Sequence, residues 1–301
     1  MPDDPAPRGP DHLIPSEPRL IQRLRFLACE FEIRSNSADF IARLDYVAQR
    51  AQQEFPIQQH CAIDVMWTGE EYRISDAGGT GDATTEVDLE LSAQVALAAL
   101  YERMHRRALG CLREHIRIHA ASGMTPDGLF LIVGPKRAGK TTLALRLMAE
   151  GYDITGDEMV LLRDGQAVAF PRRFYVREGS LPLLPEVNAL RASSPFVAHP
   201  QEGRLIAVDP TCFDRPWQIR AAPIAAILFV EPNHGARTTI VPSRKVDMVR
   251  RIVAECTPPA SGRPGWLADL CHAVDHAVTV IIRLGELDSA VLAISQVLRK
   301  A

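Results

Sequence analysis

Short apolar patterns with two different periods fill the first third of the chain. Residues 25–34 alternate apolar and polar side chains, which is the period-two pattern of a half-buried strand. Ser37 then precedes apolar side chains at helical spacing, which predicts a capped helix over residues 40–51. The other elements expected here are strands at residues 61–67 and 71–75, the turn Thr68-Gly69, a glycine-rich loop at residues 78–81 and a helix at residues 92–114. Together they predict a small α/β module over residues 16–113.

The second half of the chain has longer and more apolar runs. Residues 116–120 have strand character, and residues 125–128 read as a turn. The wholly apolar run at residues 129–133 predicts a buried strand, and a glycine-rich loop follows it directly. The next helix is expected at residues 142–150, with Gly151 in the position typical of a helix C-cap.

The remaining pattern predicts a mixed β-sheet. Further strands are expected at residues 152–155, 159–162, 166–170, 224–230, 238–241 and 278–284, and helices at residues 245–255, 265–277 and 287–298. The Asp164-Gly165 pair signals a hairpin and therefore an antiparallel pair of strands. We therefore expect an α/β fold in which residues 114–301 form one domain around a mixed sheet.

Composition narrows the environment and the partners. The 301 residues carry a net charge of −3, which offers no general attraction to nucleic acid or to an anionic membrane. The longest apolar runs are too short to span a bilayer, and the first fifteen or so residues form a Pro/Asp-rich tail that we expect to be disordered. The six cysteines show no paired spacing typical of disulfides or zinc. A cytoplasmic protein is expected.

The glycine-rich loop carries the strongest chemical signal. It matches the G-x-x-x-x-G-K-T pattern of a P-loop, between an apolar strand and a helix as that motif requires. Glycines let backbone N–H groups curl around phosphates, and the N-terminus of the helix adds a positive dipole. The predicted nucleotide-binding residues are Gly134, Pro135, Lys136, Arg137, Ala138, Gly139, Lys140, Thr141 and Thr142. Lys140 supplies a cation for the β- and γ-phosphates of ATP, and the Thr141 hydroxyl is a ligand for Mg²⁺.

Phosphoryl transfer to a hydroxyl also needs carboxylates, and two sets compete. Asp157 and Glu158 follow the strand after the P-loop helix and are the favoured set, with a solvated strand entry as the alternative interpretation. Glu231 ends the strand at residues 224–230 and resembles the Walker-B acid of ATPases, although a plain strand-end carboxylate before Pro232 is favoured.

The stretch around these motifs resembles the HPr kinase/phosphorylase superfamily. That family has a strand histidine, a P-loop and an Asp-Asp segment at the separations of His119, Lys140 and Asp157 here. The match covers residues 114–170, with weaker likeness in the C-terminal strand and helix. The resemblance implies a P-loop built into a mixed sheet, similar to phosphoenolpyruvate carboxykinase rather than to Ras.

The resemblance also implies roles for the residues. Asp157 would be the general base for the acceptor hydroxyl, His119 would adjust its charge, and Lys140 would serve catalysis at the transferred phosphate. Glu158 would be a carboxylate for Mg²⁺ or for the acceptor, although the family has the shorter Asp at this position. The cofactors implied are ATP and Mg²⁺, and the family's ring assemblies imply a homo-oligomer.

The departures from the family are equally informative. The glycine-rich segment associated with phosphorolysis has no counterpart here, and neither does the family's C-terminal signature. Reverse phosphorylase activity is therefore not expected, and HPr is not expected as the acceptor. The chain looks closer to divergent relatives that phosphorylate a serine hydroxyl of a peptide or small molecule.

Two further groups of residues invite weaker hypotheses. Arg172, Arg173 and Arg177 follow a predicted strand, where arginine forks suit phosphate oxygens but a solvated basic edge is as good an interpretation. His272 and His276 have a spacing that can bind metal, as do His115 and His119, yet surface or packing histidines are favoured.

The leading hypothesis is an ATP-dependent kinase that phosphorylates a hydroxyl of a peptide, protein or small molecule. Serine is the favoured acceptor. The alternatives are a P-loop ATPase or GTPase that uses Glu231, and a non-catalytic module that senses nucleotide. Fold-level analogy carries part of the kinase hypothesis.

Overall fold

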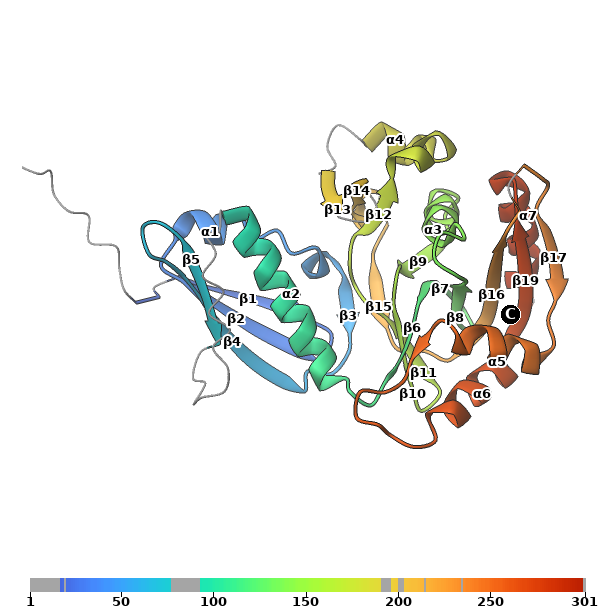
Figure 1. Ribbon diagram of the computed structural model, residues 1–301, viewed down its shortest axis with the longest axis horizontal. Coiled ribbons are helices and arrows are strands. Elements are labelled where there is room, and N and C mark those ends of the chain that lie inside the picture. Colours follow the sequence, from blue (N-terminus) through green and yellow to red (C-terminus); the bar gives the residue numbers. More distant parts are fainter. Residues whose placement is uncertain are drawn as a thin grey trace, which may run out of the picture. The chain divides into compact units, whose positions relative to one another are not determined.

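The chain divides into two compact units in a computed structural model (Figure 1). The structure describes residues 17–18, 20–76, 93–190, 196–199, 203–213, 215–233 and 235–299. The first unit contains the residues up to Tyr46 together with Ile57–Cys111, and the second contains Val47–Pro56 and Leu112–Ala301. The expected tail at residues 1–15, the loop at residues 78–81 and the start of the helix expected from residue 92 lie outside the described residues.

The first unit is a four-stranded sheet with a long helix. Its elements are β1 (Leu20–Phe26), β2 (Cys29–Ser35), α1 (Ala38–Ala42), β4 (Gln59–Trp67), β5 (Tyr72–Asp76) and α2 (Ala93–Cys111). The strand order is β1-β2-β4-β5, with β2 and β4 parallel and the outer pairs antiparallel. Helix α2 packs on β1, β2 and β5 through one buried stripe: Ala96, Leu100, Met104 and Ala108. The Thr68-Gly69 turn is confirmed between β4 and β5.

Two predictions in this unit are wrong. The strand expected at residues 25–34 is a hairpin, because β1 and β2 pair from Phe26↔Cys29 outward. Its turn contains Leu27 at φ 48°, an unfavourable conformation for leucine, and this position lacks the usual turn residues. The helix expected at residues 40–51 ends at Ala42, and the chain then enters the second unit with the 3₁₀ turn η1 (Val47–Arg50). The capping role of Ser37 is confirmed, since its Oγ accepts a hydrogen bond from the Phe40 N–H at 3.2 Å.

The second unit is built on a six-stranded mixed sheet with the order β17-β19-β16-β8-β7-β9. These strands are β7 (Ala120–Thr125), β8 (Gly128–Val133), β9 (Asp153–Gly156), β16 (Ile224–Pro232), β17 (Thr239–Pro242) and β19 (Val278–Leu284). Strand β8 is parallel to β16 and antiparallel to β7, so the mixed sheet is confirmed.

Four helices cover this sheet on both faces. They are α3 (Lys140–Ala149), α5 (Lys245–Val253), α6 (Trp266–His276) and α7 (Leu287–Leu298). Helices α3 and α7 share one hydrophobic core with the sheet, and α5 and α6 share the other. Alternate residues of β8 enter the two cores, Phe130 and Ile132 on one face and Leu129, Leu131 and Val133 on the other. All of β8 is therefore buried, which explains its wholly apolar sequence.

Smaller sheets complete the unit. Strands β6 (Ile116–Ile118), β10 (Val160–Arg163), β11 (Gln166–Ala169) and β18 (Cys256–Thr257) form a sheet in the order β11-β10-β6-β18. Strands β12 (Phe174–Arg177), β13 (Phe196–His199) and β14 (Gly203–Val208) form a second, and β3 (Gln52–Glu54) pairs with β15 (Gln218–Arg220). Short helices are η2 (Glu178–Leu183), α4 (Pro185–Ala189) and η4 (Pro210–Phe213).

The strand expected at residues 116–120 is divided between two sheets. Strand β6 ends at Ile118, and β7 begins at Ala120 and pairs with both β8 and β9. The Asp164-Gly165 hairpin is confirmed between β10 and β11, with positive φ at both residues. Gly151 is also confirmed at the end of α3, with φ 95°.

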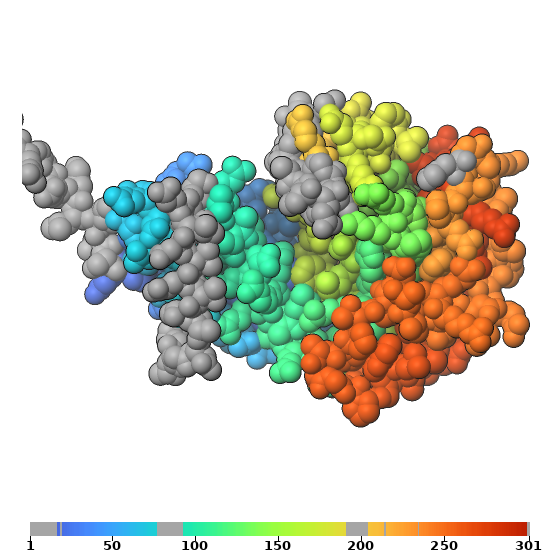
Figure 2. All heavy atoms as spheres, viewed as in Figure 1, coloured from blue at the N-terminus to red at the C-terminus, as the bar shows by residue number. Residues whose placement is uncertain are grey.

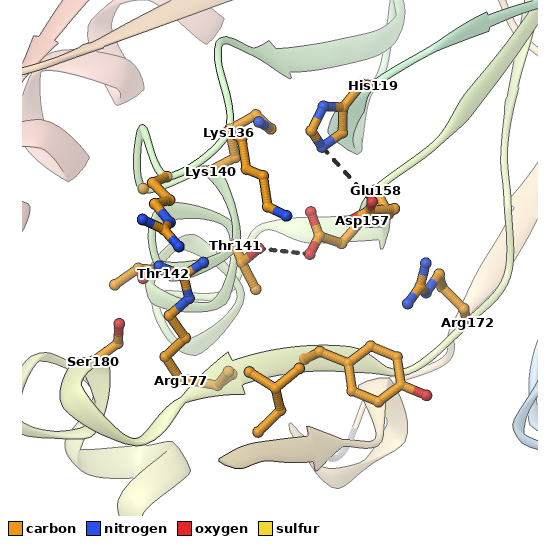
Figure 3. A pocket seen from close by; sticks show the side chains of 15 residues that line it. His119, Lys136, Lys140, Thr141, Thr142, Asp157, Glu158, Arg172, Arg177 and Ser180 are labelled. Atoms are coloured by element: carbon orange, nitrogen blue, oxygen red, sulfur yellow. Dashed lines mark hydrogen bonds and ion pairs between the residues drawn. The ribbon is translucent and has the colours of Figure 1, made fainter. Parts of the chain in front are cut away.

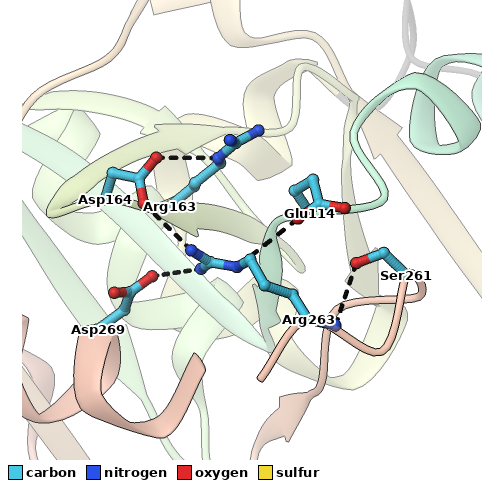
Figure 4. A network of polar contacts seen from close by, with 6 residues as sticks. All are labelled: Glu114, Arg163, Asp164, Ser261, Arg263 and Asp269. Carbon is cyan, nitrogen blue, oxygen red and sulfur yellow. Dashed lines mark hydrogen bonds and ion pairs between the residues drawn. The ribbon is translucent and has the colours of Figure 1, made fainter. Parts of the chain in front are cut away.

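Polar contacts of Arg263 fasten the end of the second unit that carries α6 (Figure 4). Its guanidinium contacts Asp164 in the β10–β11 turn at 3.1 Å, Asp269 in α6, and Glu114 at 3.8 Å. In the space-filling view the orange residues, which include α5 and α6, form a continuous surface (Figure 2). Among the described residues, no helix combines the length and apolarity needed to cross a membrane.

Candidate functional site

The glycine-rich loop (residues 134–142) leaves the end of β8 and enters α3. Gly134 has φ 156°, and a Cβ built there would lie 2.5 Å from the carbonyl oxygen of Val230. Gly139 caps α3 at φ 96° without a side-chain capping bond, which leaves the first N–H groups of the helix for another acceptor. Both glycines are therefore required by the path of the loop, one by a close approach and one by its left-handed backbone.

Lys140 is folded back under this loop. Its Nζ donates to the carbonyl oxygens of Gly134 at 2.6 Å and Pro135 at 3.1 Å, and the residue is only 6% exposed. Burial lowers the pKa of the Lys140 ammonium, while the charges of Glu255, Asp157 and Glu158 oppose that shift. The loop thus holds a buried cation, positioned by backbone carbonyls, at the start of a helix.

Asp157 lies opposite the loop, just after β9. Its side chain is buried, and its Oδ2 accepts a hydrogen bond from Thr141 Oγ1 at 2.7 Å. Burial raises the pKa of the Asp157 carboxyl, and the bond from Thr141 works against this rise. Thr141 and Asp157, which are 16 positions apart in the sequence, are therefore in direct contact.

The backbone conformation of Glu158 brings its side chain to the pocket that Asp157 also lines. Neighbouring side chains of a regular strand point to opposite faces, but Glu158 has φ 77° and follows the end of β9. A positive φ at a non-glycine residue costs about 1–3 kcal/mol and is typical of functional sites. The turn places both consecutive carboxylates on one pocket, and the Glu158 side chain stays 51% exposed.

His119 lies between two carboxylates, at the junction of β6 and β7. Its Nε2 is 3.8 Å from Glu158 Oε1, and its Nδ1 is 3.5 Å from Glu255 Oε2. The backbone N–H of His119 also donates to the carbonyl oxygen of Glu255 at 2.8 Å. Glu255 precedes β18, which pairs with β6 and so delivers this carboxylate to the histidine. No sequence pattern singles out Glu255, because only the pairing of distant segments brings it near His119.

These elements surround one pocket of about 490 Å³ (Figure 3). The lining residues that sequence analysis expected in a nucleotide or catalytic role are His119, Lys136, Arg137, Gly139, Lys140, Thr141, Thr142, Asp157 and Glu158. The expected residues Gly134, Pro135 and Ala138 are not in the lining: the first two hold Lys140, and Ala138 is buried. The pocket therefore brings the predicted phosphate-binding and carboxylate groups together.

The opposite wall of the pocket comes from β12, η2 and β14. It includes two of the three arginines considered above, Arg172 and Arg177, whereas Arg173 does not line it. The residues that the sequence analysis did not single out are Tyr175, Val176, Ser180 and Leu205. The Arg172 Cζ lies 4.9 Å from the centroid of the Tyr175 ring, a stacking distance for a guanidinium.

Glu231 is engaged elsewhere. One carboxylate oxygen pairs with Arg251 Nη1 at 2.5 Å and the other lies 4.0 Å from Arg283 Nε. It is not among the residues that line the pocket. This arrangement agrees with the interpretation of Glu231 as a strand-end carboxylate.

The two histidine pairs have different surroundings in the structure. The rings of His272 and His276 lie 4.2 Å apart, and His276 Nδ1 contacts the His272 carbonyl oxygen at 2.8 Å. His115 and His119 are separated by β6 rather than sharing one strand. Within the described part of the chain, no group of three His, Cys, Asp or Glu side chains could hold a metal by itself.

A comparison with solved structures gives distant likenesses. The chain is similar in structure to the Hpr(Ser) kinase/phosphatase from Coxiella burnetii, with 11% identity, a TM-score of 0.30, and coverage of 61% of this chain and 88% of that one. No family model matches the sequence, and no curated protein does. A likeness this weak carries no argument about activity, so the site has to be judged by its own geometry.

Proposed function

We propose that this chain is an ATP-dependent kinase that transfers the γ-phosphate to a hydroxyl group of a peptide, protein or small molecule, with serine as the model acceptor. The observation that carries the proposal is the hydrogen bond of 2.7 Å between Thr141 and Asp157. It joins the loop suited to a triphosphate with the carboxylate suited to a hydroxyl, in one pocket.

The nucleotide half of the site is a P-loop in this proposal. The N–H groups at the start of α3 and the Lys140 ammonium would bind the phosphate oxygens, and the helix dipole adds positive potential. Lys136 and Arg137 line the pocket from the middle of the loop and contribute further positive charge. These contacts recognise phosphates rather than a base, so ATP is the proposed rather than the demonstrated nucleotide.

The donor set also fits Mg²⁺. Thr141 Oγ1 and the carboxylates of Asp157 and Glu158 are oxygen ligands of the type this ion prefers, and a nucleotide-bound Mg²⁺ needs only one or two of them besides phosphate. The Thr141 hydroxyl can donate its hydrogen bond to Asp157 while the lone pairs of its oxygen remain available to the metal. When bound, Mg²⁺ neutralises charge on the β- and γ-phosphates.

The acceptor half of the site rests on Asp157. Asp157 Oδ2 accepts the hydrogen bond from Thr141. In the proposed step, the other carboxylate oxygen of Asp157 accepts the proton of the acceptor hydroxyl, and the oxygen of that hydroxyl attacks the γ-phosphorus. The bond to the β-phosphate oxygen breaks as the new bond forms, and ADP leaves with that oxygen. A carboxylate whose pKa is raised by burial is a stronger base for this step than an exposed one.

His119 and its two carboxylates support this chemistry. Glu255 holds the imidazole from one side, and Glu158 lies on the other side, within the pocket. We assign His119 to orienting Glu158 and to adjusting the charge around Asp157, and Glu255 to positioning His119. Glu158 is then the carboxylate that faces the metal or the acceptor.

The two rival functions use the same loop differently. An ATPase with Glu231 as its Walker-B acid is disfavoured, since that carboxylate pairs with Arg251 and Arg283 and is not in the pocket lining. A module that only senses nucleotide would not need two carboxylates and a histidine beside the phosphate loop. The kinase proposal uses all of these groups.

The direct test is incubation of the full chain with Mg²⁺, γ-labelled ATP and fractionated lysate. Transfer of label to a hydroxyl-bearing species, absent with Asp157→Asn, is the expected result. Release of labelled phosphate to water alone would favour the ATPase. Binding of ATP with neither outcome would favour the sensing module.

A further inference from the structure

The pocket has a second basic wall that the phosphate loop does not account for. Arg172 and Arg177 come from the segment that leads through β12, and both line the pocket. In Figure 3 the Arg177 side chain extends toward Thr142, on the side of the nucleotide loop. Arg172 lies instead on the side occupied by Asp157 and Glu158, where the proposed function puts the acceptor.

Arg172 forms no ion pair with another described residue. Among the described residues no carboxylate lies within ion-pairing distance of its guanidinium, which instead stacks on the face of Tyr175, with Cζ 4.9 Å from the ring centroid. It is nevertheless close enough for its charge to lower the pKa of Asp157, against the larger effect of burial. The side chain is half-buried, so this cation has lost part of its hydration without gaining an anionic partner.

The chemistry of this position fits one class of ligand group. A guanidinium presents paired N–H donors that match the two oxygens of a carboxylate or phosphate. Stacking on Tyr175 restricts the guanidinium plane and leaves its N–H edge for a ligand. An ammonium group of the acceptor would find no hydrogen-bond acceptor on the arginine, which has only donors. An apolar group would form no hydrogen bond with it.

We propose that Arg172, stacked on Tyr175, binds an oxyanion carried by the acceptor itself. The acceptor is then a hydroxyl compound with a carboxylate or a phosphate close to the hydroxyl that approaches Asp157. This inference rests on the proposed kinase function for the direction of the hydroxyl, but the oxyanion site stands on the geometry of Arg172 alone. Specificity follows, since a neutral alcohol lacks the group that Arg172 holds.

The test measures binding before it measures turnover. The full chain is loaded with Mg²⁺ and the non-hydrolysable analogue AMP-PNP, which fills the phosphate loop, and is titrated by calorimetry with three probes. Glycerate carries a carboxylate beside hydroxyls, glycerol 3-phosphate carries a phosphate, and glycerol carries neither. At least one charged probe should bind at least about tenfold more tightly than glycerol, and the better of the two identifies the oxyanion.

Substitution of the arginine decides whether this preference belongs to the site. Arg172→Gln should weaken the charged probe by about 10- to 100-fold, the scale of a hydrogen bond to a charged group, and Arg172→Lys should recover part of the loss. Arg173→Gln is the matched control, because Arg173 is the adjacent arginine outside the pocket lining, and it should leave probe binding unchanged. AMP-PNP affinity is measured for every variant, so that loss of nucleotide is not mistaken for loss of the oxyanion.

The outcomes separate this inference from the kinase proposal. The oxyanion site would be overturned if glycerol and both charged probes bind equally, or if no probe binds. It would also be overturned if the preference for a charged probe survives Arg172→Gln. Tight binding of a charged probe through Arg172, with no transfer of label from ATP to it or to any lysate species, would keep the oxyanion site and reject the kinase.

Discussion

Thr141 Oγ1 donates a hydrogen bond to Asp157 Oδ2 over 2.7 Å, so that helix α3 and the turn after β9 are linked where both line the pocket. The bond fixes one carboxylate oxygen of Asp157. It also explains how a carboxylate can be buried at this point without losing every polar partner.

Replacing this carboxylate should abolish transfer but not nucleotide binding. Asp157→Asn keeps the shape of the side chain and removes the proton acceptor, so the rate of phosphoryl transfer should fall by about 10²- to 10⁴-fold, the usual contribution of a general base. Affinity for Mg·ATP should stay within about tenfold, since Lys140 and the helix N-terminus remain. Glu231→Gln is the matched control, a carboxylate outside the pocket lining that should retain activity. Loss of transfer with Glu231→Gln instead would assign the reaction to that residue.

The same substitution should change how stability depends on pH. Burial raises the folded-state pKa of Asp157 above the ordinary value of 3.8, so the folded state holds this proton more tightly than the unfolded chain. The stabilisation is full below pH 3.8 and is lost as pH rises through the folded pKa. Asp157→Asn has no such titration, so it should gain stability relative to wild type as pH rises from 3.8 through the folded pKa, as measured by urea unfolding of the nucleotide-free chain. A difference that stays constant across that range would show that Asp157 is not buried as a poorly compensated carboxylate.

Gly134 should be intolerant of a side chain. A Cβ there would lie 2.5 Å from the Val230 carbonyl oxygen, on a backbone with φ 156°, so Gly134→Ala should lower the free energy of unfolding by about 1–3 kcal/mol and weaken ATP binding. Gly179→Ala is the control in the same unit, because nothing lies within 4 Å of the position that its methyl carbon would take and its φ is not positive. Urea unfolding of both variants provides the comparison. Equal stability of the two would mean that the loop takes a different path.

Glu255 should act on transfer through His119. Glu255→Gln removes the charge 3.5 Å from His119 Nδ1, and kcat should fall roughly tenfold, the scale of one hydrogen bond to a charged group, with little change in the KM for ATP. His119→Asn should lower kcat as well, and the double variant should be no worse than His119→Asn alone. Glu255→Asp should restore part of the loss. Multiplicative effects in the double variant would show that Glu255 acts independently of the histidine.

Local sequence was enough to predict the buried strand and the glycine-rich loop that follows it. The run Gly128–Val133 is apolar throughout because β8 is buried on both faces, and the glycines that follow have the positive φ values that the loop requires. Asp157 was a candidate carboxylate from its place after a predicted strand, and the family resemblance implied its role as general base, but its contact with Thr141 was not predicted. The contact itself depends on β9 pairing with β7, which no local pattern reveals.

The errors have physical causes as well. The Ala120–Thr125 segment has little intrinsic preference for a strand, yet it becomes β7 because it pairs on both sides. The turn between β1 and β2 contains Leu27 rather than Gly or Asn, so the hairpin was hidden inside one alternating pattern. Glu255 reaches His119 through the pairing of β18 with β6, and this long-range contact has no signature in the spacing of either residue.

The central claim is that residues 134–142 bind a nucleoside triphosphate, and the dissociation constant of Mg·ATP for Lys140→Ala tests it most directly. Lys245→Ala is the matched control, since Lys245 Nζ also donates to a backbone carbonyl, that of Val274 at 3.0 Å, but lies outside the pocket lining. Calorimetry should find saturable binding to wild type and to Lys245→Ala, and binding about 10- to 100-fold weaker for Lys140→Ala, as expected when a charge-assisted contact to phosphate is lost. Equal affinity of Lys140→Ala and wild type, or no binding of Mg·ATP to wild type, would contradict the account.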